Sequence, residues 1–440
     1  MEKEKNNRSS FSGKIGFVLS AAGASVGLGN IWRFPYLAAK YGGGIFLLIY
    51  ILLALTFGYT MIVAESALGR MTRKSPVGAF KAFGKKAGWL SFGGWINAII
   101  PVLIVPYYSV IGGWVIKYFV EYLKGNGAKL AEDGYFSKFI SNGLSTEICF
   151  IVFCMFTLII IYAGVRNGIE RVSKFMMPIL VVLSVIIAIY SVTRPGALAG
   201  VKYFLVPNPK NFSWMTVVTA MGQMFYSLSI AMGILVTFGS YMKKDTSIED
   251  STRNVEVFDT AIAIMAGLMI IPAVFAFSGG DPDTLQAGPS LMFITIPKVF
   301  DSMGFGTFAG ILFFLLVLFA AVTSSIALTE SAVSTVEDEL KWSRKKSTVI
   351  VGCIMIILGT LSCLGYGPLS FVKIIGMQFL DFFDFLTNSV MMPIAALMTS
   401  LFVSKVVGVD RMEEEIRHGE SKFRRKKIFV VMIKYLCPIF

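Results

Sequence analysis

The stretch GASVGLGN (residues 23–30) places three glycines inside an apolar run, and a second interruption, GQMFYSLSIAMG (residues 222–233), divides a later run. Ten apolar runs are long enough to cross a membrane, which takes about 20 residues, and an eleventh begins near residue 428. They are 15–39, 44–69, 89–122, 148–164, 169–193, 213–242, 255–279, 304–336, 347–366 and 374–404. The interruptions fall in the first and sixth runs, so each opens a group of five. Because five is odd, the second group is inverted relative to the first.

Composition places this chain among all-α polytopic membrane proteins. Of its 440 residues, 55% are hydrophobic and 15% charged, and the mean hydropathy is +0.71. Soluble domains carry about 25% charged residues. The 5 cysteines form no CxxC pair, which argues against a disulfide framework or a zinc site. The single histidine, His418, lies in a basic tail, so a histidine-based catalytic centre is excluded and we expect no enzyme.

The distribution of positive charge predicts the orientation. The segments on the side of the N-terminus hold 28 Lys and Arg, against 10 on the other side. Cytoplasmic loops carry such an excess, so we expect a multi-pass protein of the cell (inner) membrane with a cytoplasmic N-terminus. The net charge of +13 then reflects orientation in the bilayer and predicts no nucleic-acid partner. The polar start MEKEKNNRSS is not that of a cleavable signal peptide.

The domain organisation follows from these runs. We expect a cytoplasmic N-terminal gate segment (1–14), a first five-helix repeat (15–193), a second five-helix repeat (213–404), a basic cytoplasmic loop (405–426) and a partial eleventh helix (427–440). The loop 280–303 is expected to contain a short helix, either folding over the mouth of the protein or lying as an ordinary surface loop.

Two broken helices at matching positions point to a ligand. Unwinding a helix inside the bilayer exposes amides and carbonyls that lipid cannot satisfy, at several kcal/mol per group. Half-helix N-termini suit a carboxylate, while free carbonyls suit Na⁺ or an ammonium group. The alternative is that the glycines only permit close helix contact. Hydroxyls at Thr323, Ser324 and Ser325 and the intramembrane carboxylates Asp259 and Glu65 are further candidates for function.

Two longer stretches resemble the neurotransmitter:sodium symporter family. They are GLGNIWRFPYLAAKYGGGIF (residues 27–46) and TSSIALTESAVSTVEDELKWSRK (residues 323–345). The resemblance is to bacterial amino-acid transporters of this family, and it implies the LeuT fold. That fold is a 5+5 inverted repeat with helices 1 and 6 unwound, here with about 11 transmembrane segments.

The resemblance also implies the ligands of two Na⁺ ions and a substrate. One sodium site would use the carbonyls of Gly23, Val26 and Ala320 with the hydroxyls of Thr323 and Ser324; the other would use the Ser25 carbonyl, Asn30, Ser227 and Asp259. The substrate would contact Ala24, Gly27, Gly29, Ile104, Tyr108, Tyr226, Ser227, Ser229, Met232, Ser324 and Leu328. Arg33 and Asp384 would form an outer gate, and Arg8 and Asp338 an inner one.

The function implied is sodium-coupled uptake of a hydrophobic or aromatic L-amino acid by alternating access. Asp259 stands where chloride-dependent relatives keep a neutral Asn, so its fixed charge predicts that chloride is not needed. Ala231 replaces a Gly that is common in the second break, and its methyl group is expected to trim the pocket. The alternatives are a proton-coupled amino-acid transporter that uses Asp259 or Glu65, a passive channel and a non-transporting scaffold. The sequence leaves the substrate and the oligomeric state open.

Overall fold

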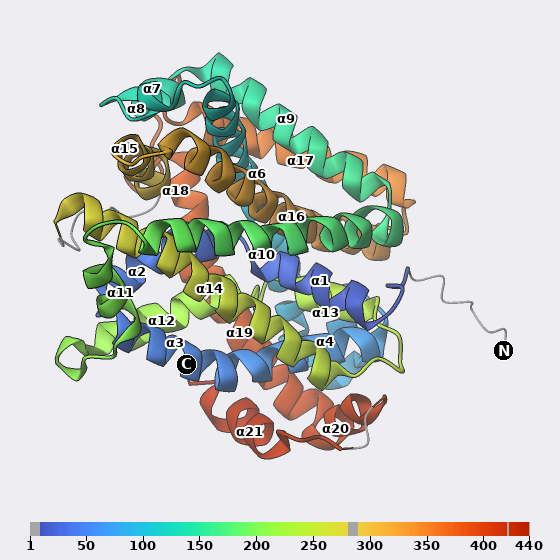
Figure 1. Ribbon diagram of the computed structural model, residues 1–440. Coiled ribbons are helices and arrows are strands. Elements are labelled where there is room, and N and C mark those ends of the chain that lie inside the picture. The colour runs from blue at the N-terminus through green and yellow to red at the C-terminus, as the bar shows by residue number, and fades with distance from the viewer. Residues whose placement is uncertain (1–8, 280–288, 420–421, 440) are drawn as a thin grey trace.

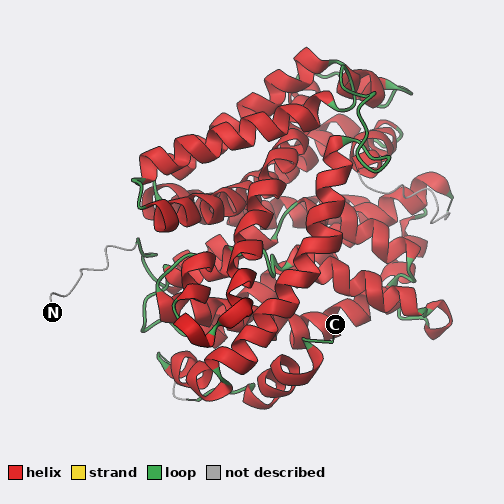
Figure 2. Cartoon of the chain, turned by 180° about the vertical axis from the view of Figure 1, so that it is seen from behind, coloured by secondary structure: helices red, strands yellow, loops and turns green. Residues whose placement is uncertain are grey.

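The computed structural model describes residues 9–279, 289–419 and 422–439. Within this part the chain is built of helices, without a strand (Figure 2). The first half comprises α1 (Lys14–Ser25), η1 (Gly29–Arg33), α2 (Phe34–Lys40), α3 (Gly44–Leu53), η2 (Ala54–Gly58), α4 (Tyr59–Thr72), α5 (Pro76–Lys81), η3 (Gly84–Lys86), η4 (Gly88–Ser91), α6 (Phe92–Leu123), α7 (Gly127–Leu130), α8 (Tyr135–Ser141), α9 (Gly143–Tyr162), η5 (Val165–Glu170), α10 (Arg171–Val192), α11 (Ala197–Leu205) and η6 (Pro209–Asn211). The η elements are short 3₁₀ or π-helical turns.

The second half repeats the pattern of long helices after a broken one. It comprises α12 (Trp214–Ser227), α13 (Ile234–Ser240), α14 (Ile248–Ser278), η8 (Leu291–Thr295), α15 (Ile296–Asp301), α16 (Gly306–Leu340), α17 (Arg344–Leu364), α18 (Phe379–Asp384), η9 (Phe385–Met391), α19 (Met392–Leu401), η10 (Phe402–Val407), α20 (Val409–Arg417), α21 (Lys426–Val431) and η11 (Met432–Leu436).

The long helices account for the predicted membrane-spanning runs. In the described part, 8 helices are long and apolar enough to cross a membrane, and a ninth span is α1 joined to η1 and α2 with a bend of 52°. The sixth run is divided into α12 and α13, each too short to span alone. The eleventh run forms only the helix 426–436, which at 1.5 Å per residue covers about half of the hydrocarbon core.

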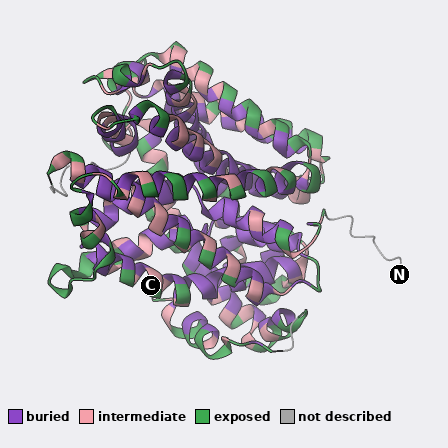
Figure 3. Cartoon of the chain, in the orientation of Figure 1, coloured by how far each residue is buried: buried purple, intermediate pink, exposed green. Residues whose placement is uncertain are grey.

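The two breaks lie inside the molecule, where residues 21–32 and 227–242 are buried. Figure 1 shows the long helices lying side by side, with the short helices α7, α8, α11 and α15 at the end away from the N-terminus. Figure 3 shows buried residues along the centre and exposed residues on the outward faces of α9 and α10. Most of those outward residues are apolar, among them Ile159 and Phe175, which are 62% and 65% exposed. Such faces suit lipid rather than water.

The break in the sixth span has an unusual backbone. Ser229, Ala231 and Gly233 have φ angles of 54°, 60° and 69°, in the left-handed region that favours glycine. These left-handed residues end α12 and change the direction of the chain before α13 begins. In the first span, glycine is needed for close approach: a Cβ on Gly29 would lie 2.4 Å from the ring of Tyr226.

Candidate functional site

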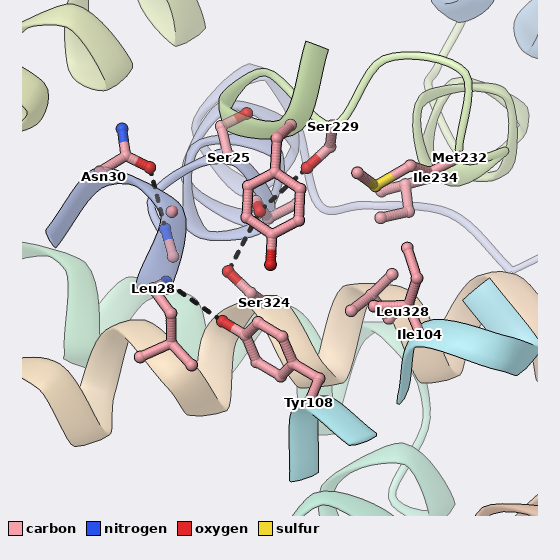
Figure 4. A pocket seen from close by; sticks show the side chains of 14 residues that line it. Ser25, Leu28, Asn30, Ile104, Tyr108, Ser229, Met232, Ile234, Ser324 and Leu328 are labelled. Atoms are coloured by element: carbon pink, nitrogen blue, oxygen red, sulfur yellow. Dashed lines mark hydrogen bonds between the residues drawn. The ribbon is translucent and has the colours of Figure 1, made fainter. Parts of the chain in front are cut away.

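The two breaks line a cavity with about 20 Å³ of free space. Figure 4 shows its lining side chains converging from the first break, from α6, from α16 and from the chain between α12 and α13. The lining residues are Ala24, Ser25, Gly27, Leu28, Gly29, Asn30, Ile104, Tyr108, Tyr226, Ser229, Met232, Ile234, Ser324 and Leu328. None of these residues is charged, so the cavity combines backbone polar groups at one end with an apolar remainder.

The polar end of the cavity is formed by the first break. The Leu28 amide donates to the Tyr108 hydroxyl at 3.3 Å, and the Gly27 amide donates to Asn30 Oδ1 at 3.3 Å. The Gly29 carbonyl accepts from Gln223 at 2.9 Å. Amides and one phenol at the start of a half-helix are groups that suit a carboxylate.

The apolar end is lined by aliphatic side chains from three elements. Ile104 comes from α6 and Leu328 from α16, while Met232 and Ile234 flank Gly233 at the start of α13. Figure 4 shows these four residues grouped on one side of the cavity. Ala231 is not among the lining residues, so its methyl group does not trim the pocket. The expectation for that residue was therefore wrong; the Ala231 amide donates to Glu65 on α4, away from the cavity lining.

A buried carboxylate lies beside the cavity. Asp259 on α14 is fully buried; its Oδ1 accepts from Asn30 at 2.8 Å and from the Ser227 hydroxyl at 2.7 Å. Its Oδ2 accepts from the Tyr50 hydroxyl at 2.6 Å. Three donors from three other helices therefore hold one charge. They bring together Asn30, Ser227 and Asp259, which the family resemblance grouped in one site.

A second group of oxygens lies where α16 meets the first break. The Ser324 hydroxyl lies 3.2 Å from the Gly23 carbonyl oxygen and 3.4 Å from that of Val26. The hydroxyl of Thr323 lies 3.2 Å from the carbonyl oxygen of Ala320 on the preceding turn. Thr323 also lies against Gly23, since a Cβ on that glycine would be 3.1 Å from the Thr323 Cβ. Gly23, Val26, Thr323 and Ser324 therefore meet at one junction, and Ala320 lies one turn away on α16. Neutral oxygens of this kind are the ligands of hard cations.

Two buried side chains that do not line the cavity form hydrogen bonds to backbone groups of the breaks. Glu65 on α4 accepts the Ala231 amide at 2.8 Å, and Gln223 donates to the Gly29 carbonyl. Both satisfy backbone groups that unwinding leaves free. The sequence singled out Glu65 as an intramembrane carboxylate, whereas Gln223 carried no signal beyond being a polar residue within an apolar run.

The predicted outer gate residues line a second pocket, here called the vestibule, but do not form an ion pair. The vestibule is lined by Trp32, Arg33, Tyr36, Leu37, Tyr107, Ile111, Tyr226, Pro289, Leu380, Asp381 and Asp384. Arg33 stacks over the ring of Tyr226, with its guanidinium carbon 5.4 Å from the ring centroid. Asp384 instead accepts hydrogen bonds from Tyr107 and Asn388, at 3.2 and 2.6 Å. Because Pro289 is among the residues that line the vestibule, the chain just before η8 forms part of its wall.

The chain before α1 packs against α1 and α13, in the region of the predicted inner gate. The ring of Phe11 is buried among Phe17, Phe238 and Tyr241, and its amide donates to the Tyr241 carbonyl at 3.1 Å. Asp338 accepts from the Ser75 amide at 2.6 Å. The proposed partner of Asp338, Arg8, lies outside the described residues.

The family assignment follows from comparison of the whole chain. The model of the sodium:neurotransmitter symporter family matches residues 8–130 and 137–440. The chain belongs to this family. It is 37% identical to the sodium-dependent transporter YhdH of Bacillus subtilis, over 93% of this chain and 91% of YhdH. It is also 31% identical to a sodium-dependent transporter of Haemophilus influenzae, over 100% of this chain and 98% of that one.

A solved structure within the symporter family has the same fold. A crystal structure of MhsT in complex with L-phenylalanine superposes with a TM-score of 0.88 at 34% identity, and the match covers 98% of both chains. The protein is therefore a LeuT-fold, multi-pass membrane symporter that uses Na⁺. Because this is a family of transporters, the prediction that the protein is not an enzyme is confirmed, and the scaffold and passive-channel alternatives lose their basis.

The structure adds residues to the predicted substrate site and gives one predicted residue a different contact. Ten of the eleven predicted substrate residues line the cavity, whereas Ser227 turns toward Asp259. Leu28, Ile234 and the Asp259 partner Tyr50 were missed. A lone tyrosine in an apolar run signals only that its hydroxyl needs some partner. The aliphatic residues gave no signal because pocket and core positions have the same composition.

Proposed function

We propose that this symporter carries one hydrophobic or aromatic L-amino acid into the cell together with Na⁺, by alternating access and without chloride. The observation that supports the substrate class is the cavity between the two breaks, which is polar at one end, apolar at the other and free of charged lining residues. The free space between these side chains is about 20 Å³, room for about one water. The lining must therefore move apart to admit an amino acid, and the proposed substrate class rests on the chemistry of the lining residues.

The polar end fits the backbone of such a substrate. Its carboxylate would meet the amides around Gly27 and Gly29 and the Tyr108 hydroxyl, which contacts the Leu28 amide. Its ammonium group would meet carbonyls of the two breaks, among them Ala24, whose oxygen accepts from the Ser229 hydroxyl at 3.0 Å. The hydroxyls that occupy these carbonyls are weak partners that an ammonium group can replace.

The apolar end fits a large side chain. Met232 is flexible and polarizable, so it can repack around different substrates, aromatic ones included. A cationic or anionic side chain would be buried there without a partner, at a cost of several kcal/mol. MhsT was crystallised with L-phenylalanine, a side chain of the expected kind.

Two sodium sites are proposed beside this cavity. One uses the Gly23, Val26 and Ala320 carbonyls with the Thr323 and Ser324 hydroxyls. The other uses the Ser25 carbonyl, Asn30, Ser227, Asp259 and the substrate carboxylate. Because Asp259 supplies a fixed negative charge at the second site, no chloride is needed to balance the cation.

The driving force is sufficient for strong accumulation. Each Na⁺ contributes roughly 2.3 kcal/mol from 100 mV and about 1.4 kcal/mol from a tenfold gradient. Two ions supply roughly 7 kcal/mol, which corresponds to about a 10⁵-fold limit. The first, second, sixth and seventh spans would rock against the rest, opening the Arg33–Asp384 and Arg8–Asp338 gates in turn. The N-terminus would face the cytoplasm, as the distribution of Lys and Arg predicts.

The test is uptake of a panel of labelled amino acids into proteoliposomes. An inward Na⁺ gradient is compared with K⁺ in place of Na⁺, and chloride with gluconate. We expect uptake of large hydrophobic amino acids that needs Na⁺ and is unchanged in gluconate. A requirement for chloride would contradict the role of Asp259. Uptake driven only by a pH gradient would transfer coupling to Asp259 or Glu65 and overturn both sodium sites.

A further inference from the structure

The carboxylate of the outer gate is held by its neighbours on one oxygen. Asp384 Oδ1 accepts from the Tyr107 hydroxyl at 3.2 Å and from Asn388 Nδ2 at 2.6 Å. Both hydrogen bonds go to Oδ1, so Oδ2 keeps its lone pairs for another donor. Hydrogen bonds to a charged carboxylate are the stronger kind, so this arrangement fixes the side chain of Asp384.

The two donors are themselves placed by packing. Tyr107 on α6 is 1% exposed, and its hydroxyl also lies 3.4 Å from the Thr387 hydroxyl. Asn388 lies in the π-helical turn η9 (Phe385–Met391), four residues after Asp384. A π-helical turn inside a helix commonly marks a functional position, because it re-aims the side chains around it. The spacing of four residues places Asn388 and Asp384 on the same face of the helix, within reach of a hydrogen bond.

Arg33, the positively charged residue of the predicted outer gate, contacts a residue that lines the cavity. Arg33 lies over the ring of Tyr226, which lines both the cavity and the vestibule. Asp384 lines the same vestibule. A guanidinium group over an aromatic face keeps its N–H groups at the edge free to donate. Arg33 can therefore pair with Asp384 while its planar group still covers Tyr226.

We propose that Tyr107 and Asn388 are positioning residues of the outer gate, which hold Asp384 Oδ1 so that Oδ2 receives Arg33 when the vestibule closes in Na⁺. The inference rests on the proposed transport function. Preorganisation of one partner lowers the entropy lost when an ion pair forms. Without it, Asp384 would rotate, the pair would be weaker, and bound substrate would escape faster.

The experiment measures the rate at which labelled amino acid leaves the purified full-length protein in Na⁺, after dilution into excess unlabelled amino acid. We expect Tyr107→Phe and Asn388→Leu each to raise the dissociation rate about tenfold, the loss expected for one hydrogen bond to a charged group. Tyr118→Phe is the matched control, because Tyr118 lies on the same helix and donates to the Phe293 carbonyl instead.

A double-mutant cycle separates positioning from packing. Asp384→Asn alone should raise the dissociation rate, and Tyr107→Phe should then add nothing. The inference is overturned if Tyr107→Phe leaves the rate unchanged. It is equally overturned if Tyr107→Phe has the same effect in the Asp384→Asn background, because the hydroxyl would then act independently of the carboxylate.

A second measurement keeps this inference distinct from the proposed function. If the wild-type protein binds no amino acid in Na⁺, the proposed substrate fails, and gate closure is followed instead by thiol modification of an Ile111→Cys variant in a Cys353→Ser background. Ile111 lines the vestibule, and Cys353 is an exposed native thiol. Tyr107→Phe should raise the modification rate in Na⁺ several-fold, and an unchanged rate overturns the inference.

Discussion

The hydroxyl of Tyr50 donates to Asp259 Oδ2 at 2.6 Å, across 209 positions of sequence, and leaves Oδ1 to Asn30 and Ser227. One oxygen of the Asp259 carboxylate is thus engaged by a structural partner. The other is shared with the two side chains that are proposed to hold Na⁺. This division of roles between the two oxygens leads to separate expectations for Asp259 and Tyr50.

Asp259→Asn should create a need for chloride. The substitution keeps the shape of the side chain but removes its charge, so a bound Na⁺ is no longer balanced. We expect Na⁺-driven uptake to fall at least tenfold in gluconate and to recover in part in chloride. Uptake that is equal to wild type in gluconate would contradict the proposed charge balance.

Tyr50→Phe should destabilise the fold without changing the ion requirement. It removes one hydrogen bond to a buried charge, which is worth about 1.5–3 kcal/mol. Thermal unfolding in detergent should shift to lower temperature, while gluconate should have no effect on the remaining uptake. If chloride became necessary, Tyr50 would be acting on the charge of the site rather than on its geometry.

Ala231→Gly should stabilise the protein. The φ angle of 60° at Ala231 is strained for a residue with a Cβ and free for glycine, a difference of about 1 kcal/mol. Since Ala231 does not line the cavity, substrate preference should stay as it is. A lower unfolding temperature for this variant would show that packing of the methyl group outweighs backbone strain.

Ile234→Phe should narrow the range of substrates. The larger ring would fill the apolar end of the cavity, which has little spare volume, so aromatic amino acids should lose more than tenfold in uptake and small apolar ones much less. Competition of unlabelled amino acids against a small labelled substrate measures this shift. An equal loss for all substrates would place Ile234 outside the side-chain pocket.

Arg70→Met should destabilise the protein strongly. The Arg70 side chain is fully buried, donates to Glu415 Oε1 at 2.6 Å and to the Thr246 carbonyl at 2.6 Å, and also contacts the Glu415 carbonyl. Its removal leaves a largely buried carboxylate on α20 unpaired, at about 3–5 kcal/mol.

The control for Arg70 is Lys81→Met, at the half-exposed ion pair of Lys81 with Glu339. Exposed pairs contribute about 0–1 kcal/mol, so the unfolding temperature of this variant should hardly change. Similar shifts for the two variants would mean that α20 is not held by the Arg70 contact.

The sequence alone predicted the class of fold and the position of its two breaks, since both depend on local composition. A run of about 20 apolar residues spans a bilayer whatever its neighbours are, and glycines at 23, 27 and 29 weaken a helix wherever it packs. The family motifs then grouped the ligands around Ser324 and Asp259, and the structure brings those groups together.

Partners that lie far apart in the chain were decided only by the tertiary structure. Tyr50 holds Asp259, Tyr107 holds Asp384, and Arg33 lies on Tyr226 instead of forming its predicted ion pair. The hydrophobic pattern of a helix reports which residues are buried but not which helix buries them. In a membrane protein that limit is severe, because lipid-facing and protein-facing sides are both apolar. The pairing of polar groups therefore depends on how the helices pack, and no single segment contains that information.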